Sequence, residues 1–394
     1  MTRLSHAPLA ASLKFLAAVS AFAFGACAQA ADLPVGVELP LTGGMARAGT
    51  AQLEGIRIAA DMFNQRDPKH TVKLTVIDDE AQPAKAVSAV EKLASQGVLA
   101  ITGGYGSNSV SPASEAADKA GLVYITSGAV DSAMTSRGLK NFFRVGPASG
   151  YAKTMIGVLT DMNVKSVSIV SSTKQAPTDL SKDVSSALTA KGVKVTVHEF
   201  DPSMTDFKPI VNKIKLQDKP DVMVMMGYEN DYIGILRAAK VLKPPVKAVI
   251  GSWALVTPKM AAEFPDLVNN VVGNAMLPHP VQFASPEGKA FVAAYRKAYN
   301  KDPDYLAEFS YVQSTVLFDA LAKASDKGTL KSGGVASELR AQPFDTLIGT
   351  VHFDNRGENP AFLNSMAQIQ DGKVVVIWPK EKATGKLNYP AQPW

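Results

Sequence analysis

Residues 103–109 have the composition of an anion-binding loop. They read Gly-Gly-Tyr-Gly-Ser-Asn-Ser and lie between a short β-branched run and a helical stretch. Glycines allow close approach of the backbone, and hydroxyls with free amides at a helix N-terminus favour an anion. We therefore predict that Tyr105, Gly106 and Ser107 contact a carboxylate. The alternative is that Ser107 or Ser109 only caps the helix.

Other loops after predicted strands supply further candidates. Ser127 and Gly128 form a second small-residue loop that could present polar groups to the same point, although it could equally be a simple turn. Tyr228 and Trp253 each follow a strand in the second half of the chain, so both are candidates to face a ligand. The alternative for each aromatic residue is packing beneath its own sheet.

Arg47 and Lys174 are candidate cationic partners for a carboxylate. Each lies in a loop at a strand end, where a positive side chain is otherwise simply exposed to solvent. Asp78, Asp79 and Glu80 also end a strand, and we interpret them as a solvated acidic turn rather than a metal site.

Motifs for catalysis and cofactor binding are poorly represented. The sequence contains neither a phosphate loop, nor a Gly-x-Ser-x-Gly elbow, nor a zinc-type His-x-x-x-His. The loop at 103–109 imitates a dinucleotide fingerprint only in part, because Ser109 replaces the third glycine and Pro112 follows. We predict no cofactor, no metal and no enzymatic activity; an extracellular enzyme is the minority alternative.

The first 30 residues are typical of a cleaved signal peptide. Arg3 and Lys14 precede an apolar run at 15–27, and a small-x-small pattern follows at 28–30. The run is shorter than the roughly 20 residues of a bilayer crossing. We predict export to the periplasm. Cleavage removes Cys27, the only cysteine, and lipid attachment at Cys27 is the minority alternative.

Charge and length exclude some classes of protein. The formal net charge is +5, and the leader contributes two of these positive charges and no acid. Basic residues are scattered among acids instead of forming stripes with aromatic residues, so we predict no nucleic-acid partner. A length of 394 residues favours two domains.

Alternating strands and helices predict an α/β fold with parallel sheets. Strands are expected at 33–41, 72–77, 98–102, 122–126, 166–170, 193–200, 222–226, 246–250 and 347–353, with a hairpin at 366–378. Helices are expected at 52–65, 83–96, after 109, from 151, at 286–299 and at 310–325. The alternation of strands and helices begins again after 142–147, which indicates two Rossmann-like, doubly wound lobes. Chain crossings between the lobes are placed near 145–147, 275–278 and 349–351.

Several segments resemble the branched-chain amino acid binding proteins, which are type I periplasmic binding proteins of ABC importers. The resemblance spans the mature chain and is carried by residues 37–43, 78–79, 106–109, 112–114, 207–211, 219–222, 226–228 and 235–239. It implies two lobes joined by a three-segment hinge, with the ligand enclosed between them. The N-terminal lobe would comprise 31–146 and 277–350, and the C-terminal lobe 147–276 and 351–394.

The resemblance also indicates where this chain departs from amino acid binders. In those proteins a serine matching Ser107 and a threonine hold the carboxylate, and a glutamate holds the ammonium. Val130 stands at the threonine position, Trp253 at the glutamate position and Ala48 at an aromatic one. Burying an ammonium without a counter-ion is costly. We therefore expect an aromatic acid such as a benzoate, phenylacetate or cinnamate; the alternatives are an aliphatic amino acid, an amide or urea.

The implied partners are a small carboxylate and the permease subunits of an ABC importer, with the protein acting as a monomer. A ligand-sensing module is the alternative from another class, since the same fold supports it. The chain shows neither an output domain nor a membrane-spanning helix after its lobes, so a sensor would need a separate signalling partner.

Overall fold

The computed structural model describes residues 1, 2, 4, 30–275, 281, 283 and 285–394. Most of the predicted signal peptide, including Cys27, lies outside these residues, as do positions 276–278 of the second predicted crossing. Within the described part of the chain, no helix combines the length and apolarity needed to cross a bilayer.

The first sheet has five parallel strands in the order β2-β1-β3-β4-β5. They are β1 (Ala31–Leu39), β2 (His70–Asp78), β3 (Ala100–Gly103), β4 (Val123–Thr126) and β5 (Phe142–Arg144). Leu33, Val35 and Val37 of β1 are fully buried. Near-continuous apolar runs of this kind suit a parallel sheet that helices cover on both faces.

The second sheet has seven strands in the order β14-β13-β10-β9-β8-β6-β7. They are β6 (Ser166–Ser172), β7 (Lys194–Phe200), β8 (Val222–Met226), β9 (Ala248–Gly251), β10 (Val272–Asn274), β13 (Met366–Gln370) and β14 (Lys373–Trp378). β13 pairs antiparallel with β10 and with β14, whereas the remaining pairs are parallel. A small separate hairpin joins β11 (Phe344–Thr346) to β12 (Gly349–Val351).

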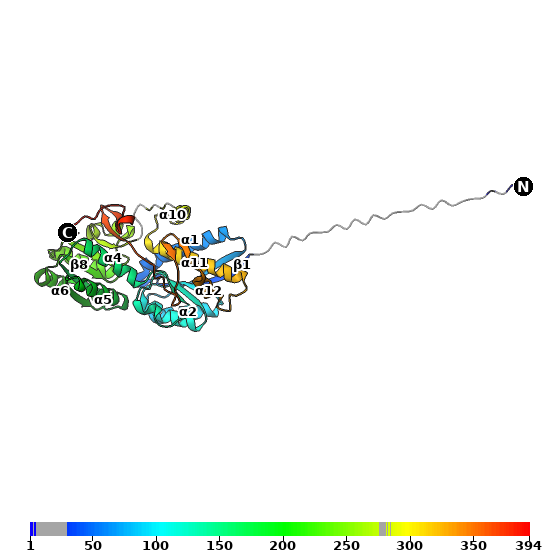
Figure 1. Ribbon diagram of the computed structural model, residues 1–394, viewed down its shortest axis with the longest axis horizontal. Coiled ribbons are helices and arrows are strands. Elements are labelled where there is room, and N and C mark those ends of the chain that lie inside the picture. The colour runs from blue at the N-terminus through cyan, green and yellow to red at the C-terminus, as the bar shows by residue number, and fades with distance from the viewer. Residues whose placement is uncertain (3, 5–29, 276–280, 282, 284) are drawn as a thin grey trace.

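Helices cover both sheets (Figure 1). Those of the first half are α1 (Ala46–Arg66), α2 (Pro83–Ser95) and α3 (Ser107–Lys119), with a short 3-10 helix η2 (Ser132–Thr135). Those that follow are α4 (Ala148–Asp161), α5 (Gln175–Ala190), α6 (Lys208–Lys213), α7 (Glu229–Leu242), α8 (Pro258–Glu263) and α9 (Pro265–Val268). The last are α10 (Pro286–Tyr299), α11 (Tyr305–Asp326) and α12 (Gly334–Ala341). The remaining helical segments are the 3-10 helices η1 (Gly43–Met45) and η4 (Lys380–Lys382) and the short π-helix η3 (Ile214–Asp218).

α10, α11 and α12 return to the first sheet. Phe291, Phe318 and Leu339 of these helices share one buried apolar cluster with residues of β1, β3 and β4. α1 and α11 approach closely at Gly55, where a Cβ would lie 2.0 Å from the carbonyl oxygen of Ala307. Only glycine allows this approach. The first sheet thus completes its core with helices from the last third of the chain.

The predicted fold class is confirmed, and most element boundaries differ from expectation by only a few residues. The hairpin at 366–378 turns at Asp371 and Gly372 as expected. The strand predicted at 347–353 is present but shorter: β12 spans only Gly349–Val351, because residues 347 and 348 form the turn between β11 and β12. The lobe boundaries themselves stay a prediction. In Figure 1 the labels β1, α2 and α12 lie toward one end of the elongated molecule, and β8, α5 and α6 toward the other.

Candidate functional site

A small cavity of ≈ 20 Å³ lies where the carboxyl ends of the two sheets face each other. The loops after β3 and β4 supply one wall, and the loops after β8 and β9 supply the opposite wall. Facing carboxyl ends are the usual ligand site of open α/β sheets. Its lining residues are Tyr105, Ser107, Ser127, Gly128, Val130, Tyr151, Ala176, Tyr228, Trp253, Tyr305 and Leu306.

The loops after β3 and β4 are joined to each other. The Gly106 N–H donates to the Gly128 carbonyl oxygen over 3.0 Å, and the Thr126 hydroxyl bridges the Gly104 carbonyl and the Gly128 N–H. A Cβ on Gly128 would lie 2.3 Å from the Gly104 oxygen, so the two loops approach this closely only with glycine there. This pairing holds Tyr105 and Ser127 on the same wall.

Ser107 is not the helix cap that the alternative interpretation suggested. Gly106, with φ of 87°, is the N-cap of α3, and the Ser107 Oγ accepts the Asp131 N–H over 3.1 Å. The Asp131 N–H therefore occupies one lone pair of the Ser107 Oγ, and the Ser107 hydroxyl hydrogen is free to point toward the cavity. Ser107 can thus donate a hydrogen bond to a ligand.

Five of the eleven described lining residues of the cavity are aromatic. The Trp253 ring centroid lies 6.1 Å from those of Tyr151 and Tyr228, and Tyr105 meets Tyr228 edge-on at 6.4 Å. The Tyr305 hydroxyl oxygen accepts the Ala254 N–H of the loop after β9. Ring faces and edges at these separations suit the enclosure of a flat apolar group.

Three buried polar atoms of the cavity residues have no partner among the described residues: the Tyr105 hydroxyl, the Ser127 Oγ and the Trp253 Nε1. All three side chains are buried. A buried donor without an acceptor is costly, on the order of 1–3 kcal/mol. Because each of these groups can donate, together with Ser107 they suit a ligand with several acceptor oxygens.

Acidic side chains stay outside the lining of this cavity, as far as the structure describes it. Acids close to the lining have other roles: Asp131 caps η2 through the Ala133 N–H, Asp231 accepts the Tyr228 N–H over 2.9 Å, and Glu229 pairs with Arg47. The described lining residues therefore present donors and rings without a carboxylate of their own to balance an ammonium group.

Four of the predicted site residues lie near the cavity without lining it. Gly106 is the cap described above, and Ala48 is buried in the same apolar cluster as Tyr105 and Val130. The Lys174 Nζ lies 4.9 Å from the Tyr228 ring centroid, and burial lowers the pKa of Lys174 while Asp231 opposes the shift. Arg47 lies at the start of α1 and contacts acidic residues instead of the cavity.

Sequence reasoning did not identify Tyr151, Tyr305 or Leu306. Tyr151 lies in the first turn of α4, directly after the first crossing between the sheets. Tyr305 and Leu306 begin α11, whose N-cap Asp304 accepts the Ala307 N–H over 3.0 Å. An aromatic residue just after a helix cap was the available signal, but nothing local indicated which sheet edge it would face.

Ionic and polar contacts hold the two halves together around the cavity. The Arg47 Nε lies 3.1 Å from a Glu229 oxygen, and its terminal nitrogen pairs with Glu263. Ser132 of η2 donates to Asp179 of α5 over 3.1 Å. Contacts from α1 and η2 to α5, α7 and α8 therefore bridge the facing sheet edges.

Glu229 makes one of these contacts dependent on pH. Burial raises the pKa of Glu229 to about 7, although the Arg47 guanidinium opposes the shift. Because this folded value lies above the ordinary carboxyl pKa of 4.5, the folded state binds the Glu229 proton more tightly than the unfolded chain does. This contribution to stability is fully present below about pH 4.5 and is lost as the pH rises through about 7.

We expect the free energy of unfolding of Glu229→Gln to depend less steeply on pH between 5 and 8 than that of the wild type. Urea unfolding at several pH values measures both slopes. If the free energy of unfolding depended equally on pH in the variant and the wild type, the conclusion that Glu229 binds a proton in this pH range would be contradicted.

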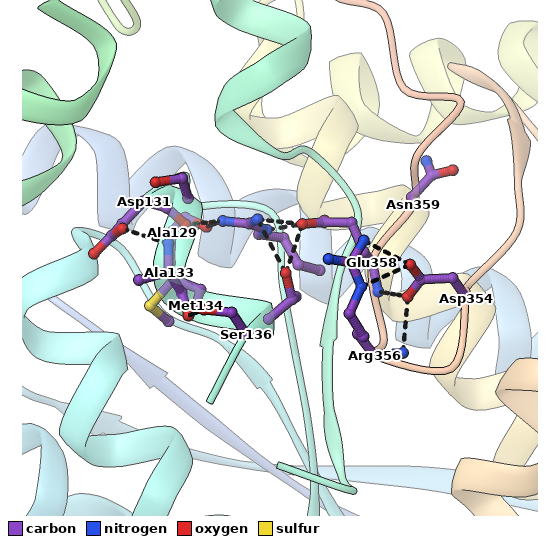
Figure 2. A network of polar contacts seen from close by, with 12 residues as sticks. Ala129, Asp131, Ala133, Met134, Ser136, Asp354, Arg356, Glu358 and Asn359 are labelled. Atoms are coloured by element: carbon purple, nitrogen blue, oxygen red, sulfur yellow. Dashed lines mark hydrogen bonds and ion pairs between the residues drawn. The ribbon is translucent and has the colours of Figure 1, made fainter. Parts of the chain in front are cut away.

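A buried ion pair connects the cavity loop with the segment after β12. The Arg144 Nε donates to Glu358 over 3.0 Å, and a second Arg144 nitrogen pairs with the other Glu358 oxygen. The remaining terminal nitrogen donates to the carbonyl oxygens of Ala129 and Asp131. Figure 2 shows this network between Asp131 and Glu358. Arg144 therefore holds the loop that carries Val130.

Comparison with known proteins gives the following relatives. The family model described as "Periplasmic binding protein" matches residues 32–373. A "Leucine-, isoleucine-, valine-, threonine-, and alanine-binding protein" from Pseudomonas aeruginosa is 27% identical over 359 residues, which cover 88% of this chain and 92% of the relative.

Solved structures share the fold. A leucine-binding protein from Thermotoga maritima is similar with a TM-score of 0.79 and 22% identity, covering 88% of this chain and 97% of that chain. A solute-binding protein of an ABC transporter from R. palustris, solved in complex with benzoate, gives a TM-score of 0.77 and 19% identity, covering 88% of this chain and 95% of that chain.

Proposed function

Because the chain belongs to the periplasmic binding protein family, we propose that it is the substrate-binding subunit of an ABC importer and that its ligand is a small aromatic carboxylate. It captures the acid between its two lobes in the periplasm and presents the closed form to the permease.

The unpartnered donors of the cavity carry this proposal. The Tyr105 hydroxyl, the Ser127 Oγ and the Trp253 Nε1 are buried without a partner among the described residues, and a carboxylate accepts several hydrogen bonds at once. Hydrogen bonds to a charged acceptor are stronger than those to a neutral one. The aromatic wall formed by Tyr151 and Tyr228 would enclose the ring of the ligand.

Aliphatic amino acids are the second candidate ligands, because the Pseudomonas aeruginosa relative is named for binding them. The composition of the cavity opposes this candidate. Neither Asp nor Glu occurs among the described residues that line it, so an α-ammonium group would be enclosed without a counter-ion. The solved relative with benzoate shows that this fold accommodates an aromatic acid.

Calorimetric titration of ligand-stripped protein with benzoate and with leucine tests the proposal. We expect benzoate to bind and leucine to bind at least about tenfold more weakly.

The Ser127→Ala substitution should weaken benzoate binding by about tenfold, because it removes one hydrogen bond to a charged group. Ser203→Ala, in an exposed turn, is the matched control. Tight leucine binding without a response to benzoate would refute the aromatic assignment and leave the transport role standing.

A further inference from the structure

A second and larger cavity of ≈ 470 Å³ adjoins the central one, and Leu306 lines both. Its walls come from both lobes: Arg47 and Ala51 of α1 lie on one side, and Glu229 and Ala262 on the other. Its volume falls within the roughly 300–1,000 Å³ that is typical of small-molecule sites. We refer to it as the outer cavity. Of the candidate residues named from the sequence, Arg47 alone lines it.

Most charged groups of the outer cavity have partners. Arg47 is bonded to Glu229 and Glu263, and the Lys301 Nζ lies 2.8 Å from a Glu54 oxygen. Lys259 is the exception among the described lining residues: it is exposed to solvent and pairs with no described acid. An amine on a ligand would have to displace a cation from its partner, which is costly for a partly buried charge, and a second carboxylate could meet only the solvated Lys259, where an ion pair contributes little. The charge pattern therefore favours an uncharged group.

Apolar surface is available between these ion pairs. Ala51, Pro258, Ala262 and Leu306 all line the outer cavity. Each methylene group of a ligand that such surfaces remove from water contributes on the order of 0.8 kcal/mol to the free energy of binding. An uncharged alkyl or alkoxy group fits this lining best.

The central cavity by itself leaves little room. At ≈ 20 Å³ it holds about one water-sized sphere, so a bound ring must displace part of the wall. Leu306 is the residue of that wall whose other side faces open space. When a ring binds, Leu306 can therefore move toward the open space of the outer cavity.

We infer that the ligand is an elongated aromatic monocarboxylate whose uncharged distal substituent passes Leu306 into the outer cavity. This inference rests on the proposed function and names its substrate class more narrowly. The carboxylate would meet the serine and tryptophan donors of the central cavity, and the distal group would lie between α1 and α8.

Calorimetric titration with benzoate, 4-methoxybenzoate and 4-butoxybenzoate tests this inference. We expect 4-butoxybenzoate to bind at least about tenfold more tightly than benzoate, because its chain is removed from water. The charged analogue 4-(carboxymethoxy)benzoate should lack most of this advantage, because Lys259, the one cation of the described lining without an acidic partner, is exposed to solvent, where an ion pair contributes little.

Variants locate the distal group. Ala262 is exposed on α8 and lines the outer cavity, so Ala262→Trp should fill it without disturbing the core. We expect this variant to reduce the advantage of 4-butoxybenzoate to below about threefold while benzoate affinity changes by less than about twofold. Ala190→Trp, at the exposed end of α5, is the matched control and should leave both affinities unchanged.

Each contrary outcome has a distinct meaning. If wild-type protein binds benzoate but binds 4-butoxybenzoate no more tightly, the elongated ligand is refuted and the proposed function stands. If Ala262→Trp keeps the full advantage, the distal group lies elsewhere and the inference is likewise refuted. If none of the aromatic acids binds while leucine does, the inference and the aromatic assignment fail together.

Discussion

Trp253→Ala is expected to weaken benzoate binding by about 30-fold or more, because buried aromatic residues at the centre of a binding site typically contribute 2 kcal/mol or more. The Trp253 ring contacts Tyr151 and Tyr228, and its Nε1 is a buried donor of the central cavity without a partner among the described residues. Removing the indole therefore removes both an apolar wall and a hydrogen-bond donor. Calorimetric titration measures the change.

A second substitution at this position separates the two contributions. Trp253→Phe keeps a ring but removes the N–H, so it should cost about tenfold in benzoate affinity, the effect of one hydrogen bond to a charged group. Trp378→Ala is the matched control, because Trp378 packs against Gly157 of α4 instead of the cavity. An unchanged affinity in Trp253→Ala would show that the indole does not contact the ligand.

Arg144→Met should lower the free energy of unfolding by about 3–5 kcal/mol, because it leaves the buried carboxylate of Glu358 without its partner. Arg144 is 1% exposed and Glu358 is 7% exposed, so water cannot replace the lost interaction. The same variant frees the carbonyl oxygens of Ala129 and Asp131, so benzoate affinity should fall as well. Urea unfolding and calorimetry measure the two effects.

The double variant Arg144→Met/Glu358→Gln tests the cause. It removes both charges and keeps an acceptor for the Thr135 hydroxyl, which donates to Glu358 over 2.8 Å. We expect it to recover at least about half of the lost stability, because the penalty arises from the unpaired charge. Arg356→Met is the control: its ion pair with Asp354 is exposed and should contribute less than about 1 kcal/mol. A double variant no more stable than Arg144→Met would contradict the ion-pair explanation.

Under the proposed function, the central cavity and the outer cavity would give the protein two separate means of selection. The central cavity would select for acceptor oxygens and against ammonium groups through its donors and its lack of acids among the described lining residues. The outer cavity would select for length and against a second charge. The Arg47–Glu229 pair between α1 and α7 lies beside the outer cavity, so the proposed closure of the lobes and enclosure of a distal group would involve the same residues.

Local sequence patterns determined the secondary structure and one half of the candidate site. Period-two and period-3.6 repetition of apolar residues depends only on neighbours along the chain, so many strands and helices could be predicted within a few residues, although others such as α5, α7 and β10 were not assigned. The loop with Tyr105 and Ser107 was recognisable because glycine and serine after a strand have a local meaning. The same reasoning identified Ser127, Tyr228 and Trp253.

Only the tertiary structure decided which distant residues complete the site. Tyr305 and Leu306 reach the cavity because α11 packs against α1, and Arg144 reaches Glu358 across 214 residues of chain. Contacts of this kind depend on how the faces of whole elements pack, and neither periodicity nor a short motif encodes the partner. Local composition therefore revealed where an anion could bind, whereas packing determined what else surrounds it and how much space lies beyond.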